Sequence, residues 1–293
     1  GLVAGTYTGT VMIRNSVNGC ESLAYPISIV VKPTPVIDAI SDFMACEGSG
    51  VAAILLNATP ANPATTYSWS GGATAGLVDG NSTGVNPQIP GFTAGATPGT
   101  YMVTVTSTLN GCTDTEEFII EIKAAPAASI GVSDSEICAG QSVTLTASPA
   151  GTYLWEDASA VNPRSVSPLS TTTYTVTVTA ANGCTDVASA TVEVNPGFDL
   201  VVTSQTEASC NAGDDGMATV MASGGTAPYT FNWSGGTVVT ASPNSTASDL
   251  AAGTYNVTAT DLNGCTAVET VVIDQPTLLV AEIISQTDET CVD

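Results

Sequence analysis

The residues with the clearest chemistry in this chain are its eight cysteines, which occur in two repeated settings. Four follow an Asn-Gly pair, and we name them the turn cysteines: Cys20, Cys112, Cys184 and Cys265. Four stand 26 positions after a turn cysteine, and we name them the first cysteines: Cys46, Cys138, Cys210 and Cys291. The chain has no Cys-x-x-Cys motif and no histidine, so it lacks the ligand pattern of a zinc site. We therefore expect disulfides, which persist in oxidising, extracellular surroundings.

The pairing of these cysteines is open, because spacing alone does not give connectivity. We expect pairing within each unit, which gives Cys46–Cys112, Cys138–Cys184 and Cys210–Cys265. One alternative crosses the junctions between units and gives Cys46–Cys184 and Cys138–Cys265; it applies if the two cysteines of a unit lie at opposite ends of a sandwich. The other alternative pairs cysteines 26 positions apart, such as Cys20 and Cys46, and it requires the chain to fold back, because 26 extended residues span roughly 80 Å.

Other candidate chemistry is sparse. Asp214 and Asp215 form the densest acidic loop and are weak candidates for Ca²⁺, but their surroundings lack the EF-hand spacing. A solvated turn explains them better, so we expect no metal and no cofactor; the alternative is Ca²⁺ that bridges the junctions between units. With no histidine, no Ser or Cys beside a base, and scattered carboxylates, the chain also lacks the parts of a nucleophilic or acid–base catalyst. We expect that it is not an enzyme.

The charge balance limits the partners. Four basic residues stand against 27 acidic ones, a formal net charge of −23. Binding to nucleic acid rests on many Lys and Arg contacts, so this surface excludes nucleic acid as a partner. It also excludes attraction to anionic lipid. No apolar stretch approaches the roughly 20 residues that span a membrane, so we expect no membrane insertion by this segment.

The cysteines must be positioned by strands. Apolar residues alternate with Thr and Ser over short runs between Pro and Gly clusters, as in Tyr174-Thr175-Val176-Thr177-Val178, and this period of two predicts half-buried strands. One Trp per unit and one Tyr in a late strand are expected to anchor each core: Trp69, Trp155, Trp233, Tyr101, Tyr174 and Tyr255. No sustained helical period occurs. The sequence therefore predicts an all-β fold, a tandem array of antiparallel β-sandwiches.

A resemblance to a known family rests on the third unit. It reads Ser209-Cys210-Asn211-Ala212-Gly213-Asp214-Asp215-Gly216, then Ser223-Gly224-Gly225-Thr226-Ala227-Pro228-Tyr229-Thr230-Phe231-Asn232-Trp233-Ser234, then Gly253-Thr254-Tyr255 and Asn263-Gly264-Cys265. This pattern resembles the SprB-type repeats of Bacteroidota surface adhesins. The second unit, with Ile137-Cys138-Ala139-Gly140-Gln141 and Thr171-Thr172-Thr173-Tyr174, is similar to the immunoglobulin-like modules of the same proteins, and the first unit resembles their polycystic-kidney-disease-like (PKD-like) modules. The family implies export by the type IX secretion system and supplies no catalytic residues.

These patterns predict five segments joined by short linkers that contain proline. They are the last strands of a preceding Ig-like domain (1–32), a PKD-like sandwich (33–124), an Ig-like sandwich (125–195), an SprB-type sandwich (196–276) and the first strand of a following domain (277–293). We therefore expect the chain to be an interior window of a longer repetitive polypeptide.

The function we expect is structural: a segment of a long extracellular repeat protein that forms a cell-surface fibre or an adhesin stalk. Its partners would be neighbouring domains of the same chain, with lateral self-association into a filament as an added interaction, because edge strands permit it. The alternative is an adhesin module that binds a ligand or glycan through variable sandwich loops, above all Gly71 to Thr97.

Overall fold

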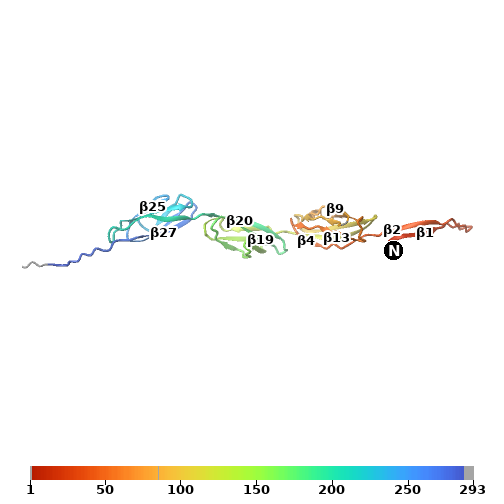
Figure 1. Ribbon diagram of the computed structural model, residues 1–293, viewed down its shortest axis with the longest axis horizontal. Helices are drawn as coiled ribbons and strands as arrows, with labels where there is room; N and C mark the ends of the chain where they lie inside the picture. Colours follow the sequence, from red (N-terminus) through yellow and green to blue (C-terminus); the bar gives the residue numbers. More distant parts are fainter. Residues whose placement is uncertain (1, 85, 287–293) are drawn as a thin grey trace, which may run out of the picture. The chain divides into compact units, whose positions relative to one another are not determined.

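The computed structural model describes residues 2–84 and 86–286, and in these residues every regular element is a strand apart from one short 3-10 turn, Ala73–Ala75 (Figure 1). The predicted all-β fold is therefore confirmed. Contacts divide the chain into two compact units. One contains the residues up to Ala127 with Pro149–Thr152 and Val178–Asp186, and the other contains the rest. Cys291, an expected disulfide cysteine, lies outside the described residues.

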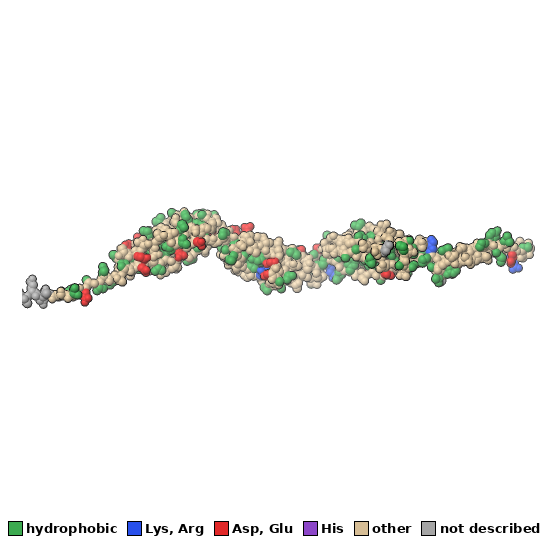
Figure 2. Space-filling view, in the orientation of Figure 1, with side chains coloured by type: hydrophobic (Ala, Val, Ile, Leu, Met, Phe, Trp, Pro, Cys, Tyr) green, Lys and Arg blue, Asp and Glu red, His purple; other side chains and the backbone are tan. Residues whose placement is uncertain are grey.

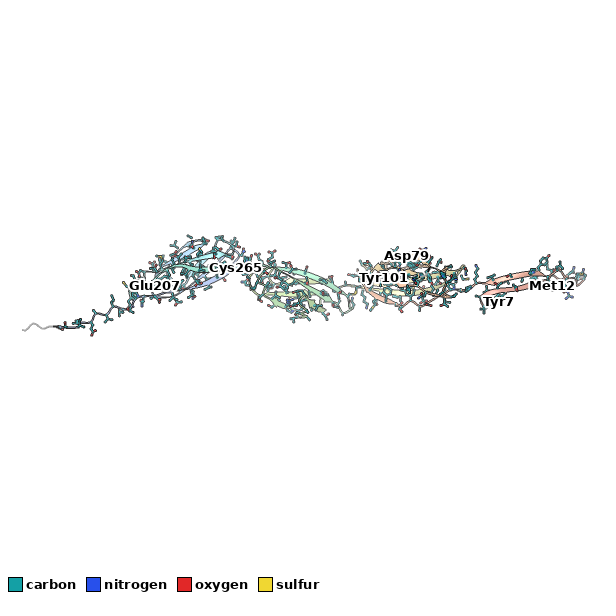
Figure 3. The ribbon with its side chains drawn as sticks, viewed as in Figure 1. Tyr7, Met12, Asp79, Tyr101, Glu207 and Cys265 are labelled. Atoms are coloured by element: carbon teal, nitrogen blue, oxygen red, sulfur yellow. A yellow bond between two sulfur atoms is a disulfide. The ribbon has the colours of Figure 1, made fainter. Side chains whose placement is uncertain are left out.

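The chain begins with a hairpin. Strands β1 (Gly5–Val11) and β2 (Tyr25–Val31) pair antiparallel from Gly5 opposite Val31 to Val11 opposite Tyr25. They form a two-stranded sheet, and almost every residue in them is exposed. The hydroxyl of Tyr7, a residue labelled in Figure 3, donates a hydrogen bond of 2.8 Å to the carbonyl of Val3.

A first sandwich follows. Its main sheet has the order β4-β13-β12-β8-β9, and the strands are β4 (Phe43–Cys46), β13 (Cys112–Lys123), β12 (Gly99–Leu109), β8 (Thr66–Ser70) and β9 (Gly80–Thr83). Three short pairs complete the sandwich: β3 (Val36–Ile37) with β7 (Ala58–Thr59), β5 (Gly50–Val51) with β11 (Phe92–Thr93), and β6 (Ile54–Leu55) with β10 (Gln88–Ile89). Alternate side chains of β12 and β13, such as Val103, Val105, Phe118 and Ile120, form its buried core.

The second sandwich has a three-stranded and a four-stranded sheet. The first has the order β14 (Ser129–Val132), β16 (Val143–Ser148) and β18 (Arg164–Val166). The other has the order β15 (Glu136–Cys138), β20 (Thr185–Asn195), β19 (Thr172–Thr179) and β17 (Thr152–Trp155). Strand β19 shows the predicted alternation, because Val176 and Val178 are buried while the threonines between them are not.

The third sandwich repeats this plan. Its larger sheet has the order β21 (Phe198–Thr206), β22 (Gly216–Gly224), β25 (Asn244–Leu250) and β24 (Thr237–Ala241). Its smaller sheet has the order β23 (Thr230–Trp233), β26 (Gly253–Thr260) and β27 (Thr266–Ile273). The core includes Val220, Trp233, Val257 and Val271.

Each sandwich contains one buried tryptophan whose indole N–H has a partner. Trp69 donates to the carbonyl of Val78, Trp155 to that of Val161, and Trp233 to the hydroxyl of Ser245. These bonds satisfy the one polar atom of a large apolar side chain, so the ring can occupy the core without a desolvation penalty.

The late-strand tyrosines also bond to backbone. The hydroxyl groups of Tyr101 and Tyr255 each donate to the carbonyl four residues earlier, Thr97 and Ala251, as Tyr7 does in the hairpin (Figure 3). Tyr174 is buried, and burial is the main cause that raises its pKa, against the lowering effect of the nearby Arg164 cation. The Gly-Thr-Tyr motif therefore ties the start of a late strand to the loop before it.

Candidate functional site: the disulfide-linked junctions

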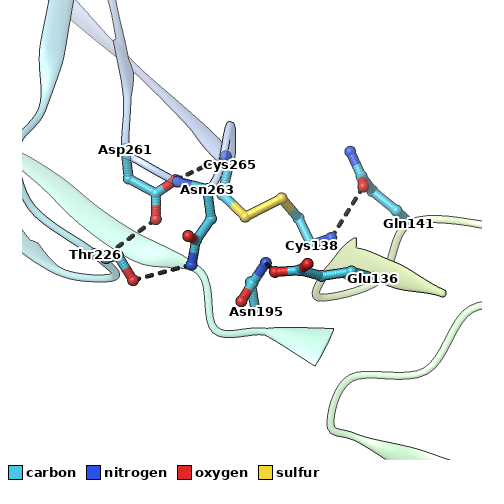
Figure 4. Close-up of a disulfide and its surroundings, with 8 residues drawn as sticks. All are labelled: Glu136, Cys138, Gln141, Asn195, Thr226, Asp261, Asn263 and Cys265. Atoms are coloured by element: carbon cyan, nitrogen blue, oxygen red, sulfur yellow. Dashed lines mark hydrogen bonds between the residues drawn. A yellow bond between two sulfur atoms is a disulfide. The ribbon is translucent and has the colours of Figure 1, made fainter. Parts of the chain in front are cut away.

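Two disulfides join consecutive sandwiches. Cys46 at the end of β4 is bonded to Cys184, which lies in the turn between β19 and β20, and the two Cα atoms are 5.6 Å apart. Cys138 at the end of β15 is bonded to Cys265, in the turn between β26 and β27, at the same Cα separation (Figure 4). Both bonds follow one rule: the first cysteine of a sandwich is joined to the turn cysteine of the next.

In the first two sandwiches, the last strand sets the positions of both cysteines. Strand β4 runs parallel to β13 and places Cys46 opposite Lys123, whereas Cys112 is the first residue of β13. Strand β15 runs parallel to β20 and places Cys138 opposite Asn195, whereas Cys184 immediately precedes β20. The two cysteines of a sandwich therefore lie at opposite ends of one strand.

The expected pairing within each unit is wrong for this reason. The 12 residues of β13 hold Cys112 and Cys46 roughly 36 Å apart at the usual rise of a strand, whereas a disulfide needs Cα atoms within about 7 Å. Pairing at an interval of 26 is wrong as well, because Cys46, Cys138, Cys184 and Cys265 are all bonded to other partners. The alternative that crosses the junctions is the one in the structure. Cys20, Cys112 and Cys210 are free thiols in the described residues.

Hydrogen bonds support the Cys46–Cys184 junction. The side chain of Asn182 donates a bond of 2.8 Å to the carbonyl of Ala124 and accepts one of 3.0 Å from the N–H of Cys184. The sulfur of Cys184 also lies 3.9 Å from the carbonyl oxygen of Lys123, a contact rather than a hydrogen bond because a disulfide sulfur carries no proton. The N–H of Glu47 bonds to the same carbonyl, which holds the end of β4 against β13. The asparagine of Asn-Gly-Cys thus supports the turn and also contacts the preceding sandwich.

The Cys138–Cys265 junction uses different contacts. The carboxylate of Asp261 is buried and accepts hydrogen bonds from the N–H groups of Asn263, Cys265 and Thr226 (Figure 4). The side chain of Asn263 bonds to the hydroxyl of Thr226, inside its own sandwich. Asp261 therefore holds the turn in shape with hydrogen bonds to a charged acceptor, the stronger class of such bonds.

Side chains of the second sandwich also form hydrogen bonds at this junction. Gln141 accepts a bond from the N–H of Cys138, and Asn195 donates to Glu136 (Figure 4). A small polar cleft of about 410 Å³ lies beside the disulfide, lined by Glu136, Ile137, Cys138, Gln141, Asn195, Leu262, Asn263 and Gly264. It contains one carboxylate and no basic group among its lining residues, so it offers no acid–base pair.

A related contact occurs where the hairpin meets the first sandwich. The ammonium group of Lys32 donates a bond of 2.8 Å to the carbonyl of Asn110, in the turn that precedes Cys112. In this turn both Asn110 and Gly111 have positive φ, as the two-residue turn of a hairpin requires, whereas in the other turns only the glycine does. The turn cysteines thus occur in two turn geometries, which the shared Asn-Gly-Cys sequence does not distinguish.

In the acidic loop, the carboxylate of Asp215 stabilises the local backbone. One oxygen of Asp215 accepts the N–H of Ser209, and this bonding to Ser209 lowers the pKa of the carboxyl. Asp214 is exposed. Among the described residues no group of three or more Cys, Asp or Glu side chains converges to hold a metal. Carboxylates are scattered over the surface in Figure 2.

The segment proposed to hold variable binding loops, Gly71 to Thr97, contributes to the sandwich. It includes β9, β10 and β11, and the side chains of Leu77, Ile89 and Ala94 are buried in the core.

Among residues 2–84 and 86–286 there is no helix with the length and hydropathy that a membrane span requires.

One family model matches part of this chain. Residues 202–238 match the family model of the SprB repeat, which confirms the resemblance for that part of the third sandwich. A search of curated proteins found no significant match.

Several solved structures are similar to this chain at low sequence identity. The N-terminal eight Ig domains of Down syndrome cell adhesion molecule are 16% identical, with 92% of this chain and 46% of that chain covered and a TM-score of 0.36. This chain thus spans less than half the length of that protein. An I-band fragment of titin is 13% identical over 84% and 100% of the two chains, with a TM-score of 0.38. Extracellular domains 3–5 of Drosophila OTK are 12% identical over 83% and 98%, with a TM-score of 0.29. The chain therefore consists of successive β-sandwiches, and part of the third is similar to the SprB repeat.

Proposed function

We propose that this chain is a structural segment of a long extracellular repeat protein, which forms a cell-surface fibre or an adhesin stalk and carries tension along its length. The observation that carries the proposal is that both disulfides join one sandwich to the next and neither closes a loop within a sandwich. A domain that acted alone would gain its stability from a bond inside its own core. A bond between neighbours instead limits how far they can separate.

The two disulfides overlap along the chain, because Cys138 lies between Cys46 and Cys184. The shortest covalent route from Cys46 to Cys265 passes through the first disulfide to Cys184, back along the chain to Cys138, and through the second disulfide. This route contains 46 residues (184 minus 138), whereas the reduced chain has 219 (265 minus 46). At about 3.5 Å per extended residue, these lengths are roughly 160 Å and roughly 770 Å. Complete unfolding of the oxidised segment between Cys46 and Cys265 is therefore limited to about a fifth of the length that the reduced segment can reach.

The surroundings implied by this chemistry are outside the cell. Disulfides persist in oxidising compartments and are rare in the cytosol. The similarity of residues 202–238 to the SprB repeat supports a surface location, and with it the export route and bacterial group that the resemblance implies. An acidic surface keeps such a segment soluble.

The proposal extends to the ends of the segment. The exposed β1–β2 hairpin carries the Gly-Thr-Tyr and Asn-Gly-Cys motifs of the last two strands of a sandwich, and the boundaries near residues 32, 124, 195 and 276 divide the array into its domains. The hairpin would then complete a sheet with strands of a preceding domain.

Stretching single molecules between handles at the two termini tests the proposal. With the disulfides intact, we expect total unfolding to stop about 600 Å short of the length reached by the same molecule after reduction. The matched control is the Cys46→Ser, Cys184→Ser protein under oxidising conditions. It retains a single disulfide, Cys138–Cys265, so its final length should lie between those of the oxidised and the reduced protein.

Equal final lengths for the oxidised and the reduced chain would contradict the tension-bearing role. Binding of isolated sandwiches to glycans or surfaces, with no difference in extension, would instead favour the adhesin-module function.

A further inference from the structure

The third sandwich presents an end surface that repeats the two disulfide-bonded ones. We name it the Cys210 surface, and it consists of Cys210, Asn211, Ala212, Gln275 and Pro276. Cys210 is a first cysteine by its position in the sequence, yet its thiol is free and exposed. Cys46 and Cys138, the other described first cysteines, are both half-buried in disulfides.

The turn that presents the sulfur is the same at all three positions. In each, the carbonyl of the cysteine accepts a hydrogen bond of 3.0 Å from the N–H three residues later: Ser49 at Cys46, Gln141 at Cys138 and Gly213 at Cys210. The backbone that follows Cys210 therefore makes the same type of turn as the backbone that follows the two bonded cysteines.

The Cys210 loop also lies at the end of the last strand of its sandwich, although other residues hold it there than in the first two sandwiches. The chain beside Cys46 bonds to the carbonyl of Lys123 at the end of β13, and the chain beside Cys138 bonds to that of Asn195 at the end of β20. In the third sandwich the N–H of Ala208 bonds to the carbonyl of Asp274, immediately after β27. Two further bonds, from Asn211 to Pro276 and from Ala212 to Gln275, hold the Cys210 loop at this end.

The turn cysteine of the third sandwich is not available to Cys210. Cys265 precedes β27, at the opposite end of that strand, and it is already bonded to Cys138. Both observed disulfides run from a first cysteine to the turn cysteine of the next sandwich. The partner of Cys210 under the same rule is the turn cysteine of a further sandwich.

We propose that the Cys210 surface is an interaction surface for the Asn-Gly-Cys turn of a further Ig-like sandwich, and that Cys210 forms a disulfide with that turn. The proposal rests on the structural function proposed above and names the partner of this surface. The contacts of the Cys46–Cys184 junction indicate how the turn would bind, with its asparagine donating to a backbone carbonyl after the last strand.

The bond forms by thiol–disulfide exchange with a small-molecule disulfide as oxidant. The thiolate of one cysteine attacks the oxidant, forming a mixed disulfide and releasing one thiolate. The second cysteine, as thiolate, then attacks the sulfur of the first and displaces the other thiolate. Two protein thiols lose two protons and two electrons, and one disulfide of the oxidant is reduced to two thiols.

A tandem protein tests the proposal. A second copy of residues 197–276 is inserted after Pro276 of the full chain, so that Pro276-Gly197 reproduces the natural Pro196-Gly197 linker. Cys210 of the added copy is changed to serine, which leaves Cys265 as its single cysteine. After oxidation with glutathione disulfide, free thiols are alkylated and the protein is digested with pepsin without reduction. The matched control carries Cys265→Ser in the added copy.

We expect loss of alkylation at Cys210 in the tandem protein, with its peptide joined to Cys265 of the added copy, and full alkylation in the control. A link from Cys210 to an Asn-Gly-Cys turn of a second molecule, seen as a covalent dimer, would support the same surface with the turn supplied by another chain. Continued alkylation of Cys210, or its bonding to Cys291 or another Cys210, would overturn the proposal. The Cys46–Cys184 and Cys138–Cys265 peptides in the same digest show independently that the array is folded and that its junctions are linked.

Discussion

Asn182 shows how one side chain can support a turn and a junction at once. Its oxygen accepts the N–H of Cys184, and its nitrogen donates to the carbonyl of Ala124. The two bonds use different atoms of the same amide, so substitutions can separate them. Aspartate retains the acceptor and loses the donor, whereas alanine loses both.

We expect Asn182→Asp to lower the free energy of unfolding by about 1 kcal/mol, the net value of one hydrogen bond, and Asn182→Ala to lower it by about 2 kcal/mol. Denaturant unfolding of the oxidised proteins measures both. Asn263→Asp is the matched control, because its amide donates only to Thr226 within its own sandwich. If Asn182→Asp matched the wild type, the bond to Ala124 would contribute nothing to the junction.

At the scale of the elements, strand β9 lies so close to the ring of Trp69 that its first residue, Gly80, has no room for a side chain. A Cβ added to Gly80 would lie 2.6 Å from Cζ2 of Trp69, closer than two carbon atoms can approach. The ring is buried and its N–H is held by Val78, so it has little freedom to move away. The close approach of β9 thus depends on the absence of a side chain at this position.

We expect Gly80→Ala to destabilise the first sandwich by roughly 1–3 kcal/mol, the usual cost of overpacking. Gly50→Ala is the control, because Gly50 is also in a strand of this sandwich and a Cβ there would meet nothing within 4 Å. Thermal unfolding followed by tryptophan fluorescence compares the two. Equal melting temperatures would show that Trp69 moves at no cost.

The strands themselves were largely predictable. Val176 and Val178 alternate with threonines in the sequence, and in the structure the valines are buried while the threonines are not. Each unit also has one tryptophan that occupies its core. The segment from Gly71 to Thr97 was not predictable, because its short strands carry too few residues to show a period. Its strands β9, β10 and β11 pair with β8, β6 and β5, and no local pattern records these pairings.

The pairing of the cysteines was the part that the sequence left open. The motifs place Cys112 and Cys46 in the same unit but do not show that β4 runs parallel to β13 and ends at its far end. That relation is a non-local strand pairing, and it decides between bonds within units and bonds across junctions. The free thiol of Cys210 follows from the same relation.

For the whole molecule, the two overlapping disulfides create three covalent routes between the first and the second bond. They are the chain from Cys46 to Cys138, the chain from Cys138 to Cys184, and the chain from Cys184 to Cys265. The connected molecule is thus a small network rather than a single line. A break in any one route leaves the other two intact.

This network gives the segment tolerance to damage. Lys123 and Arg164 are the only basic residues between Cys46 and Cys265, and they lie in different routes. Trypsin acting on the unfolded, oxidised chain would cut after both, and it would leave Lys32 intact because Pro33 follows it. The residues from 15 onward should still migrate as one covalent molecule on a non-reducing gel, separating into pieces only after reduction. Pairing within units would instead release the part before Ala124 at the first cut. In the presence of extracellular proteases, the backbone of this segment could therefore be cut at these two places while the disulfides keep the pieces covalently joined.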